Sequence, residues 1–380
     1  MDGSGIDLAP LAQLALLGLV IALGPLAWVW ARTRGGDASQ RLRVLTLLTL
    51  FLTFDLVLFG AFTRLTDSGL GCPDWPGCYG SASPLGARDE IHAAQTAQPT
   101  GPVTHGKAWV EMVHRYLATG VGVLIIAMTV LSWQAWRRDR SAASPALATA
   151  TLVWVCLQGA FGAWTVTLKL YPAIVTAHLL GGLGLLALLA VQAWGGRGDR
   201  VAVGAGLRRG LVAVAGLALL QIALGAWVST NYAVLACTDF PTCQGRWWPA
   251  MDFEHGFAIL RPLGTGKGGA GWLPFEALTA IHMSHRAVAL LLLTSMAVLS
   301  WRLARHPRLR RLAFGLAFIG LWQLATGISN VVLGWPLLAA VSHTGGAAAL
   351  VLVMTALWLR TRSSAVAPRA AGARLAHGAP

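Results

Sequence analysis

The chain has 380 residues, of which 56% are hydrophobic and only 12% are charged. Soluble domains carry about 25% charged residues, so this composition excludes an ordinary soluble protein. Several apolar runs reach the roughly 20 residues that a helix needs to cross the hydrocarbon core. Lipid permits only helices or closed barrels, and the alternating pattern of barrel strands is absent. The sequence therefore predicts an all-α integral membrane protein.

Hydropathy along the chain predicts nine spans. The first stands before the other eight, which fall into two groups of four. The predicted spans are 11–31, 43–63, 110–134, 146–168, 173–194, 209–230, 277–300, 311–333 and 337–359.

The formal net charge of +14 could suggest a nucleic-acid partner, but its distribution predicts none. Twenty of the 29 Lys and Arg are arginines in every second connection, from Arg32 onward and in the tail. By the positive-inside rule these connections face the cytoplasm of a bacterial inner membrane. We therefore expect the N-terminus outside, the C-terminus inside, and a leading helix that is retained, because its first residues are acidic rather than basic.

Four of the five cysteines lie in the long outer loops, 64–109 and 231–276, as Cys72 with Cys78 and Cys237 with Cys243. On the periplasmic side such pairs favour two local disulfides over free thiols or a shared metal site. Cys156 lies inside a span and is interpreted as inert packing.

The chain contains an internal duplication. Cys72 and Cys237, His178 and His343, and Gln158 and Gln323 are each 165 residues apart. Four spans per copy return the chain to the same side, so the copies are parallel four-helix bundles. This predicts an anchor helix with a basic linker (1–42), two halves (43–200 and 201–362) and a flexible tail (363–380).

Each half contains two histidines at matched depth on two different helices. They are His114 and His178 in the first half, and His285 and His343 in the second. Two imidazoles across a four-helix bundle are typical of a haem with two axial histidines. The alternatives are ordinary hydrogen-bonded interfacial histidines and a zinc site, which would need more ligands.

Small residues accompany these histidines. The pairs Gly181–Gly182 and Gly345–Gly346 follow a histidine and would make room for a flat macrocycle. A Gln-x-x-x-Gly pattern recurs and is interpreted as helix packing rather than ligand contact. Its members are Gln158/Gly162, Gln221/Gly225 and Gln323/Gly327. Asp55 is an intramembrane acid without a counterpart in the other half, and the sequence assigns it no role.

Glu111 precedes His114 by three residues and shares its helix face, whereas the second half has His282 at that place. A carboxylate in an apolar pocket can exchange protons, so Glu111 is the candidate catalytic residue. The alternative is a first-turn Glu that serves the helix dipole. Arg64, Arg115 and Arg286 are candidates for haem propionates, or are ordinary interfacial arginines.

With these residues in view, the chain resembles the heme A synthase family, in its cysteine-containing bacterial form. The resemblance covers roughly residues 43–360. It rests on Glu-x-x-His-Arg (111–115), the second His-Arg (285–286), the two further histidines, the cysteine pairs and "GAFTRLTDSGLGCPDWPGCYG" (60–80).

The resemblance implies a membrane oxidoreductase that oxidises the C8 methyl group of haem O to a formyl group, giving haem A for terminal oxidases. It implies substrate haem O between His114 and His178, haem b between His285 and His343, and a catalytic Glu111. It also implies heme O synthase and cytochrome oxidase assembly components as partners. Association of the chain with copies of itself is a further expectation. His282 and the leading helix depart from the family pattern.

Two other functions use the same residues. A di-haem b cytochrome that passes electrons from quinol would need all four histidines but not Glu111. A transporter, suggested by the parallel repeat, would instead place its polar groups near the midplane.

Overall fold

The computed structural model describes residues 9–140, 144–195, 200–262 and 272–363. Among these residues, nine helices are long and apolar enough to cross a membrane. This confirms the prediction of an all-α membrane protein with nine candidate spans. They are α1 (Ala9–Arg32), α2 (Ala38–Leu65), α4 (His105–Arg138), α5 (Ala146–Thr167), α6 (Pro172–Trp194), α7 (Ala205–Thr230), α9 (Phe275–Ala304), α10 (Arg310–Val332) and α11 (Leu337–Arg360).

The helices begin where local chemistry allows. The Asp37 side chain caps α2 by accepting from Gln40 N at 2.7 Å, and Thr104 caps α4 by accepting from Lys107 N at 3.3 Å. Pro172 opens α6, where its missing N–H costs nothing. Because its cap is Thr104, α4 starts five residues before the apolar run that defined the predicted span.

Several threonine side chains within the spans are satisfied by their own helix. In α2 the hydroxyls of Thr49 and Thr53 donate to the carbonyls four residues earlier, Leu45 O at 2.8 Å and Thr49 O at 2.7 Å. Such bonds remove the cost of an unpaired polar group in lipid. Threonine is therefore compatible with a membrane helix here.

Eight of the spanning helices pack in two sets of four. In the first helix set (α2, α4, α5 and α6), α2 and α5 each pack against both α4 and α6, so α4 and α6 lie at opposite corners. In the second helix set (α7, α9, α10 and α11), α7 and α10 each pack against both α9 and α11. Fully buried Leu45, Ile125 and Leu186 belong to the core of the first set, and Leu299 and Leu316 to that of the second.

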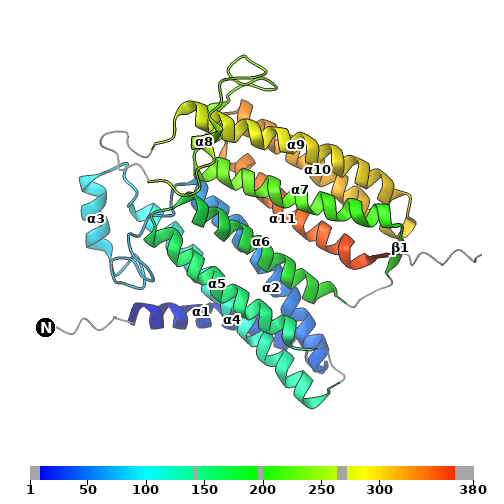
Figure 1. Ribbon diagram of the computed structural model, residues 1–380. Helices are drawn as coiled ribbons and strands as arrows, with labels where there is room; N and C mark the ends of the chain where they lie inside the picture. The colour runs from blue at the N-terminus through cyan, green and yellow to red at the C-terminus, as the bar shows by residue number, and fades with distance from the viewer. Residues whose placement is uncertain (1–8, 141–143, 196–199, 263–271, 364–380) are drawn as a thin grey trace, which may run out of the picture.

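The two sets meet along α2 and α6 on one side and α7 and α11 on the other. The contacting pairs are α2 with α11, α6 with α11, and α6 with α7. Figure 1 shows α4 and α5 on one side of the molecule, α9 and α10 on the other, and α6 and α11 between them. The leading helix α1 packs against α4 and α2, outside both sets.

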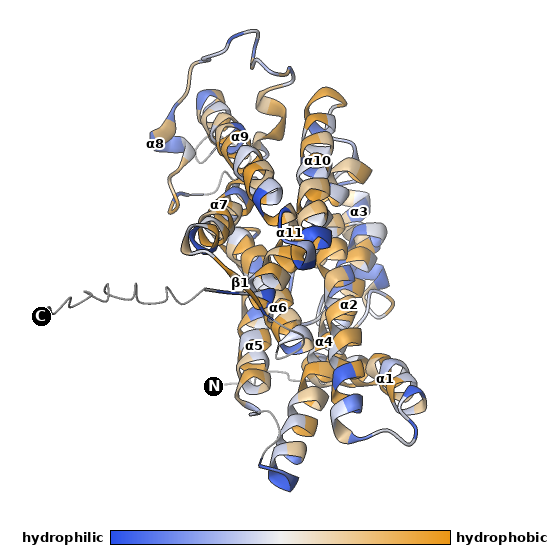
Figure 2. Ribbon diagram, turned by 90° about the vertical axis from the view of Figure 1, so that its right-hand side faces the viewer, coloured by the Kyte–Doolittle hydropathy of each residue, from blue (hydrophilic) through white to orange (hydrophobic). Residues whose placement is uncertain are grey.

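The outer surface of the helices is apolar. Leu290, Leu338 and Phe318 have exposed fractions of 70%, 80% and 63%, which a soluble protein would avoid. Figure 2 shows hydrophobic residues along the sides of the helices and hydrophilic residues gathered mainly at their ends. The surface is therefore suited to lipid.

At one end of the helices, which we call the basic end, arginines stack on tryptophans. Arg41 lies 3.6 Å from the Trp30 ring centroid and Arg140 lies 3.7 Å from that of Trp136. Arg208 on Trp358 and Arg305 on Trp301 repeat the arrangement at 3.3 and 3.8 Å. Cation–π pairs of this kind suit the interface of a membrane, where tryptophan is enriched.

Several short elements were not predicted. The loops opposite the basic end contain α3 (Arg88–Ala97), the 3-10 turn η1 (Ala233–Ala236) and α8 (Phe253–Gly256). At the basic end, η2 (Pro307–Leu309) precedes α10, and β1 (Val201–Val203) pairs in parallel with β2 (Thr361–Ser363). The predicted flexible tail lies, from residue 364, outside the described residues.

Candidate functional site

The first pair of candidate histidines comes from opposite corners of the first helix set. His114 lies on α4 and His178 on α6, and both are half-buried. The Nδ1 atoms of both rings are buried and have no hydrogen-bond partner in the described part of the chain. Each imidazole therefore has unmet bonding capacity.

The second pair repeats this placement in the second helix set, with His285 on α9 and His343 on α11. Here, however, polar neighbours reach the rings. The Thr326 hydroxyl lies 2.8 Å from His343 Nδ1, and the Gln221 amide nitrogen lies 3.0 Å from His285 Nδ1. The two pairs thus share their position but differ in their surroundings.

A glycine of a neighbouring helix lies against each of the four rings. A methyl group built on Gly60 would be 3.1 Å from His114 Cε1, and one on Gly225 would be 3.0 Å from His285 Cε1. The corresponding distance is 3.4 Å for both Gly162 with His178 and Gly327 with His343. A methyl group at Gly60 or Gly225 would therefore crowd the ring, whereas one at Gly162 or Gly327 would be in ordinary contact with it. Gly60 was missed in the sequence, although it lies 165 residues before Gly225.

The glycines predicted to pack helices and the glycines predicted to make room for a macrocycle have different contacts from those expected. Gly162, Gly225 and Gly327, predicted to serve helix packing, contact histidine rings. By contrast, Gly345 lies against Leu58 of α2, and Gly346 lies against Trp322 and Gln323. Gly181 likewise lies against Gln158, so Gly181, Gly345 and Gly346 serve helix packing, whereas beside Gly182 the nearest atom is a Val57 methyl at 4.0 Å.

Glu111 is buried, with 4% of its surface exposed, and is the seventh residue of α4. The alternative role in the first helical turn is excluded, because α4 begins at His105. One carboxylate oxygen accepts from the backbone N–H of Cys72 at 2.8 Å, and the other forms an ion pair with Arg115. The carboxylate is thus held between its own helix and the first cysteine loop.

Arg115 fixes that loop. Its guanidinium donates to three backbone carbonyls, Asp74 O at 3.1 Å, Pro76 O at 3.1 Å and Gly77 O at 2.6 Å. A disulfide joins Cys72 to Cys78 within the same loop. Five planar donors make arginine suited to such a cluster of acceptors. The first loop, Glu111 and the residue next to His114 therefore form one connected unit.

The second loop repeats this arrangement without the carboxylate. A disulfide joins Cys237 to Cys243, and Arg286 donates to Thr242 O at 2.8 Å and Asp239 O at 2.9 Å. His282, at the position of Glu111, is buried and its Nδ1 lies 3.0 Å from Ala233 O. Arg286 Nε is buried and has no partner within the described ranges.

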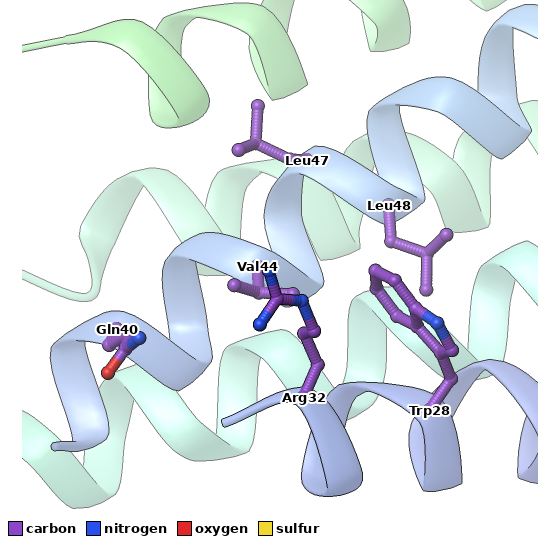
Figure 3. A pocket seen from close by; sticks show the side chains of 6 residues that line it. All are labelled: Trp28, Arg32, Gln40, Val44, Leu47 and Leu48. Carbon is purple, nitrogen blue, oxygen red and sulfur yellow. The ribbon is translucent and has the colours of Figure 1, made fainter. Parts of the chain in front are cut away.

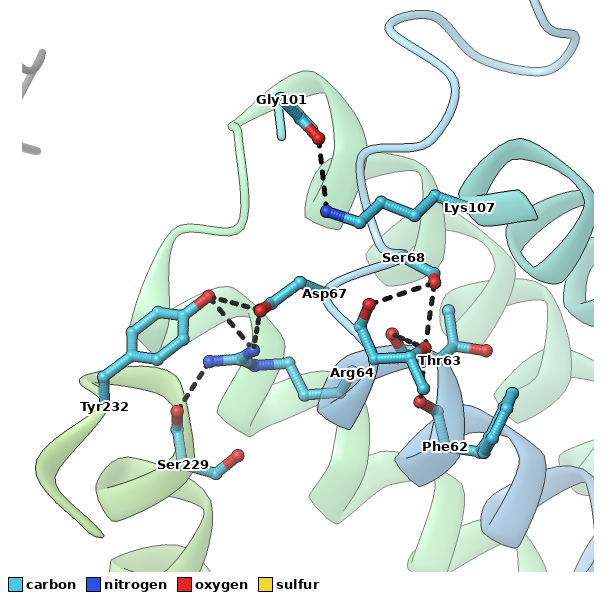
Figure 4. Close-up of polar contacts among 10 residues, drawn as sticks. Phe62, Thr63, Arg64, Asp67, Ser68, Gly101, Lys107, Ser229 and Tyr232 are labelled. Carbon is cyan, nitrogen blue, oxygen red and sulfur yellow. Dashed lines mark hydrogen bonds and ion pairs between the residues drawn. The ribbon is translucent and has the colours of Figure 1, made fainter. Parts of the chain in front are cut away.

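Arg64 joins the two helix sets near the cysteine loops, as Figure 4 shows. Its Nη2 donates to Ser229 O at 2.6 Å, and its Nη1 lies 3.2 Å from both Asp67 Oδ1 and the Tyr232 hydroxyl. The Tyr232 hydroxyl also donates to Asp67 Oδ1 at 2.8 Å. We call these four residues the seam. Each pair across it, Arg64 with Ser229 and Asp67 with Tyr232, is separated by 165 residues.

The remaining candidates lie elsewhere. Asp55 is exposed on α2 and has no hydrogen-bond partner among the described residues, and Cys156 is exposed on α5 with a free thiol. A groove of 440 Å³ opens between α1 and α2, at the basic end, and contains none of the four histidines (Figure 3). It is lined by Trp28, Arg32, Gln40, Val44, Leu47 and Leu48.

The donor set fits haem better than a bare metal ion. Among the described residues, no group of three or more His, Cys, Asp or Glu is arranged to hold a metal ion. Each helix set instead supplies two imidazoles from opposite corners, which is the ligand set of a bis-histidine haem. The buried Arg286 Nε, which has no partner among the described residues, is a polar group of the kind that a bound ligand satisfies.

Fold and site together define a polytopic helical membrane protein with two histidine pairs, one of them beside a buried carboxylate. The model of the COX15-CtaA family, described as cytochrome oxidase assembly protein, matches residues 43–355. The chain belongs to this family.

Relatives in three bacteria bear the name "Heme A synthase". The protein of Shewanella oneidensis is 37% identical over 328 residues, which cover 83% of this chain and 97% of the relative. That of Caulobacter vibrioides is 29% identical, covering 86% and 97%. That of Halalkalibacterium halodurans is 27% identical, covering 76% and 86%.

Proposed function

We propose that this protein is a heme A synthase, a membrane enzyme that oxidises the C8 methyl group of haem O to the formyl group of haem A. Membership of the family and relatives of that name over most of the chain support this function. The structural observation that carries it is Glu111, a buried carboxylate one helical turn from His114.

The two helix sets are, in this proposal, the two parallel bundles of a duplicated unit, with halves 43–200 and 201–362. Three features support it. The same contacts recur among equivalent helices, glycine lies against histidine at the same positions in both sets, and the cysteine loops have the same arginine bonds. Equivalent residues also meet at the seam.

We assign His114 and His178 to the substrate haem O, and His285 and His343 to a haem b. When bound, the haem b supplies one-electron redox chemistry. The chain's own part is to hold each macrocycle between opposite helices. The assignment of the halves follows the carboxylate, because Glu111 stands beside the first pair whereas His282 stands at that place beside the second.

Glu111 is the proposed catalytic residue. Its two bonds, to Arg115 and to Cys72 N, fix the carboxylate at the outer side of the first histidine pair. A carboxylate held in this way can accept a proton from, or electrostatically stabilise, a reacting group on the substrate. Arg115 is a positioning residue, since it holds Glu111 and the loop together.

The three candidate propionate arginines differ in what they can still bind. All four Nη donors of Arg115 have protein acceptors nearby, and Arg64 is engaged at the seam. Arg286 retains a buried Nε–H without a partner among the described residues. We therefore propose Arg286 as the propionate contact of the second haem, and loop and seam roles for Arg115 and Arg64.

The proposed orientation places the basic end in the cytoplasm and the cysteine loops in the periplasm. Arginines cluster at the basic end, and the two disulfides lie at the opposite end.

Haem O must arrive from an enzyme that makes it and haem A must leave for an oxidase. Heme O synthase and oxidase assembly components are thus the proposed partners in the bilayer.

Replacement of Glu111 by Gln tests the function. The side chain keeps its size but loses the charge, so we expect haem O to accumulate and haem A to be lost in a strain without another synthase, while haem binding persists. Extraction and chromatography of total haem measures both. The exposed Glu90→Gln on α3 is the matched control and should leave haem A unchanged.

The alternative, a di-haem cytochrome without haem modification, finds no support in the relatives named above. It predicts wild-type haem A in the Glu111→Gln strain, and that result would remove Glu111 from catalysis.

A further inference from the structure

We propose that Gln221 and Thr326 are positioning residues that retain the haem of the second pair, and that their absence from the first pair lets that haem leave. The inference rests on the proposed function and deepens it, because it explains how one duplicated unit can hold a permanent cofactor while the other exchanges a substrate.

Thr326 fixes the tautomer of His343. The hydroxyl of this buried residue donates to Trp322 O at 2.8 Å, so its oxygen is left to accept from His343 Nδ1–H, which lies 2.8 Å away. A proton on Nδ1 leaves the Nε2 lone pair for iron. The Gln323 amide also lies 3.0 Å from Nδ1. With its oxygen toward the ring it accepts from Nδ1–H as Thr326 does, whereas with its nitrogen toward the ring it would donate to Nδ1.

Gln221 is the polar neighbour of His285, but it presents its amide nitrogen to the ring. Its amide nitrogen lies 3.0 Å from Nδ1 and 3.2 Å from Nε2 of the ring. Its Oε1 is buried and lacks a partner in the described part of the chain. A side-chain amide can turn either its oxygen or its nitrogen toward a neighbour. Gln221 can therefore accept from the ring N–H once the other nitrogen holds iron.

The first helix set lacks both groups. The residues 165 positions before Gln221 and Thr326 are Leu56 and Phe161, neither of which can bond an imidazole. His114 and His178 accordingly have Nδ1 atoms without partners among the described residues. Phe59 stacks on His114 with the ring planes 13° apart, so an apolar surface covers that ring.

The physical consequence is a difference in how tightly each pair holds iron. A hydrogen bond to the far nitrogen orients a ligating imidazole and raises its basicity, and its loss costs roughly 10- to 100-fold in metal affinity. A redox cofactor has to remain bound through many cycles, whereas a substrate has to enter and its product has to leave. The polar neighbours lie beside the second histidine pair, which is the pair that has to retain its haem.

The test uses the full-length chain with His114→Ala, which leaves one haem site. Gln221→Leu and Thr326→Val are introduced separately, and haem release to excess apomyoglobin is followed by absorption. We expect haem release about 10- to 100-fold faster than from the parent. We also expect a higher reduction potential, because a less basic imidazole stabilises ferric iron less. Thr326→Ser, which keeps the hydroxyl, should restore both values.

Thr294→Val on α9 is the matched control. Within the described part of the chain this exposed hydroxyl bonds only Leu290 O of its own helix, so its loss should change neither value. In the reciprocal experiment, Leu56→Gln in a His285→Ala chain should slow haem release from the first pair. Wild-type release rates and potentials in both Gln221→Leu and Thr326→Val would overturn the inference and leave the proposed function standing. Failure of the parent chain to show a bis-histidine haem spectrum would instead overturn the haem assignment on which both depend.

Discussion

At the scale of single residues, the site depends on glycines as much as on the histidines. Four rings lie against four glycines of neighbouring helices. A methyl group on Gly60 or Gly225 would crowd its ring at 3.1 or 3.0 Å, and one on Gly162 or Gly327 would touch its ring at 3.4 Å. Core positions in proteins are packed closely enough for one methyl group to matter. The glycines therefore belong to the site although they carry no functional group.

The substitution Gly225→Ala tests this packing. The new methyl group would lie 3.0 Å from His285 Cε1, so we expect a displaced ring and a haem content of the second pair reduced by at least half. Overpacking of this kind costs about 1–3 kcal/mol. Pyridine haemochrome analysis of purified protein gives the haem content.

Gly216→Ala on the same helix is the control, because nothing lies within 4 Å of its added methyl group. Equal haem loss in both variants would mean that α7 tolerates no alanine in general, and that Gly225 has no special relation to His285.

The sequence indicated the histidines, Glu111 and the arginines as candidates, because ionisable groups are conspicuous in an apolar chain. It was insufficient for their partners. The contact of Arg115 with Gly77 and of Gln221 with His285 depends on how helices rotate about their axes, which hydropathy does not specify. The repeat spacing could have indicated Gly60, since it matches Gly225.

At the scale of elements, the cysteine loops are compact units closed by a disulfide, an arginine and an aspartate. In the second loop, the Asp239 carboxylate accepts from the backbone N–H of Gln244 at 2.7 Å and of Gly245 at 3.1 Å. The hydrogen bond from the Thr242 hydroxyl, together with these N–H groups, lowers the pKa of Asp239 below its ordinary value.

Because this pKa is lowered in the folded loop, the bonds of Asp239 contribute fully above the ordinary carboxyl pKa of about 3.9. They are lost as pH falls through the still lower value of the folded loop. We expect the amides of residues 237–246 to exchange faster at pH 3 than at pH 6, after correction for intrinsic rates. Hydrogen exchange with mass spectrometry measures this.

Asp239→Asn should exchange rapidly at both pH values, since it has no carboxylate to lose. Equal protection of the wild-type loop at pH 3 and pH 6 would show that the disulfide alone maintains its shape.

The seam is the second element that can be tested. Burial raises the pKa of Tyr232, and Asp67 raises it further, so its hydroxyl stays protonated and donates to Asp67 beyond its ordinary pKa of about 10. Tyr232→Phe removes this bond and should lower the free energy of unfolding by about 1 kcal/mol. A thermal shift of the detergent-solubilised protein reports the loss.

The stability that the wild type gains over Tyr232→Phe should be constant below pH 10 and vanish as pH rises through the raised pKa. Tyr79→Phe is the control, because the Tyr79 hydroxyl has no side-chain or backbone acceptor among the described residues. If both phenylalanine variants melt like the wild type, the seam hydrogen bonds do not stabilise the contact between the helix sets.

At the scale of the whole molecule, hydropathy and charge predicted the spans well, because lipid leaves a helix few alternatives. The ends of the spans were predicted less accurately. The predicted span 110–134 became α4 from His105 to Arg138, since polar caps and arginines extend a helix past its apolar run. The strands β1 and β2 could not be foreseen, because their partners are 160 residues apart.

Orientation is the prediction that belongs to this scale. Alkaline phosphatase fused within the outer loops, after residue 85 or residue 250, should be active, because that enzyme needs an oxidising compartment for its disulfides. Fusions after residue 140 or residue 362 should be inactive, and green fluorescent protein at those two points should fluoresce. The reverse pattern would place the disulfide loops in the cytoplasm and contradict the positive-inside assignment.

The contact of each histidine ring with a glycine has a consequence for how the molecule responds to its surroundings. A ring supported by a side chain can adjust when that side chain changes rotamer, but main chain offers no such freedom. The nitrogens will therefore follow any movement of the neighbouring helix axis almost rigidly. A detergent, a bilayer thickness or a bound partner that shifts α2, α5, α7 or α10 by an ångström would thus move the ring nitrogens, and in the proposed haem protein the haem spectrum would report that shift.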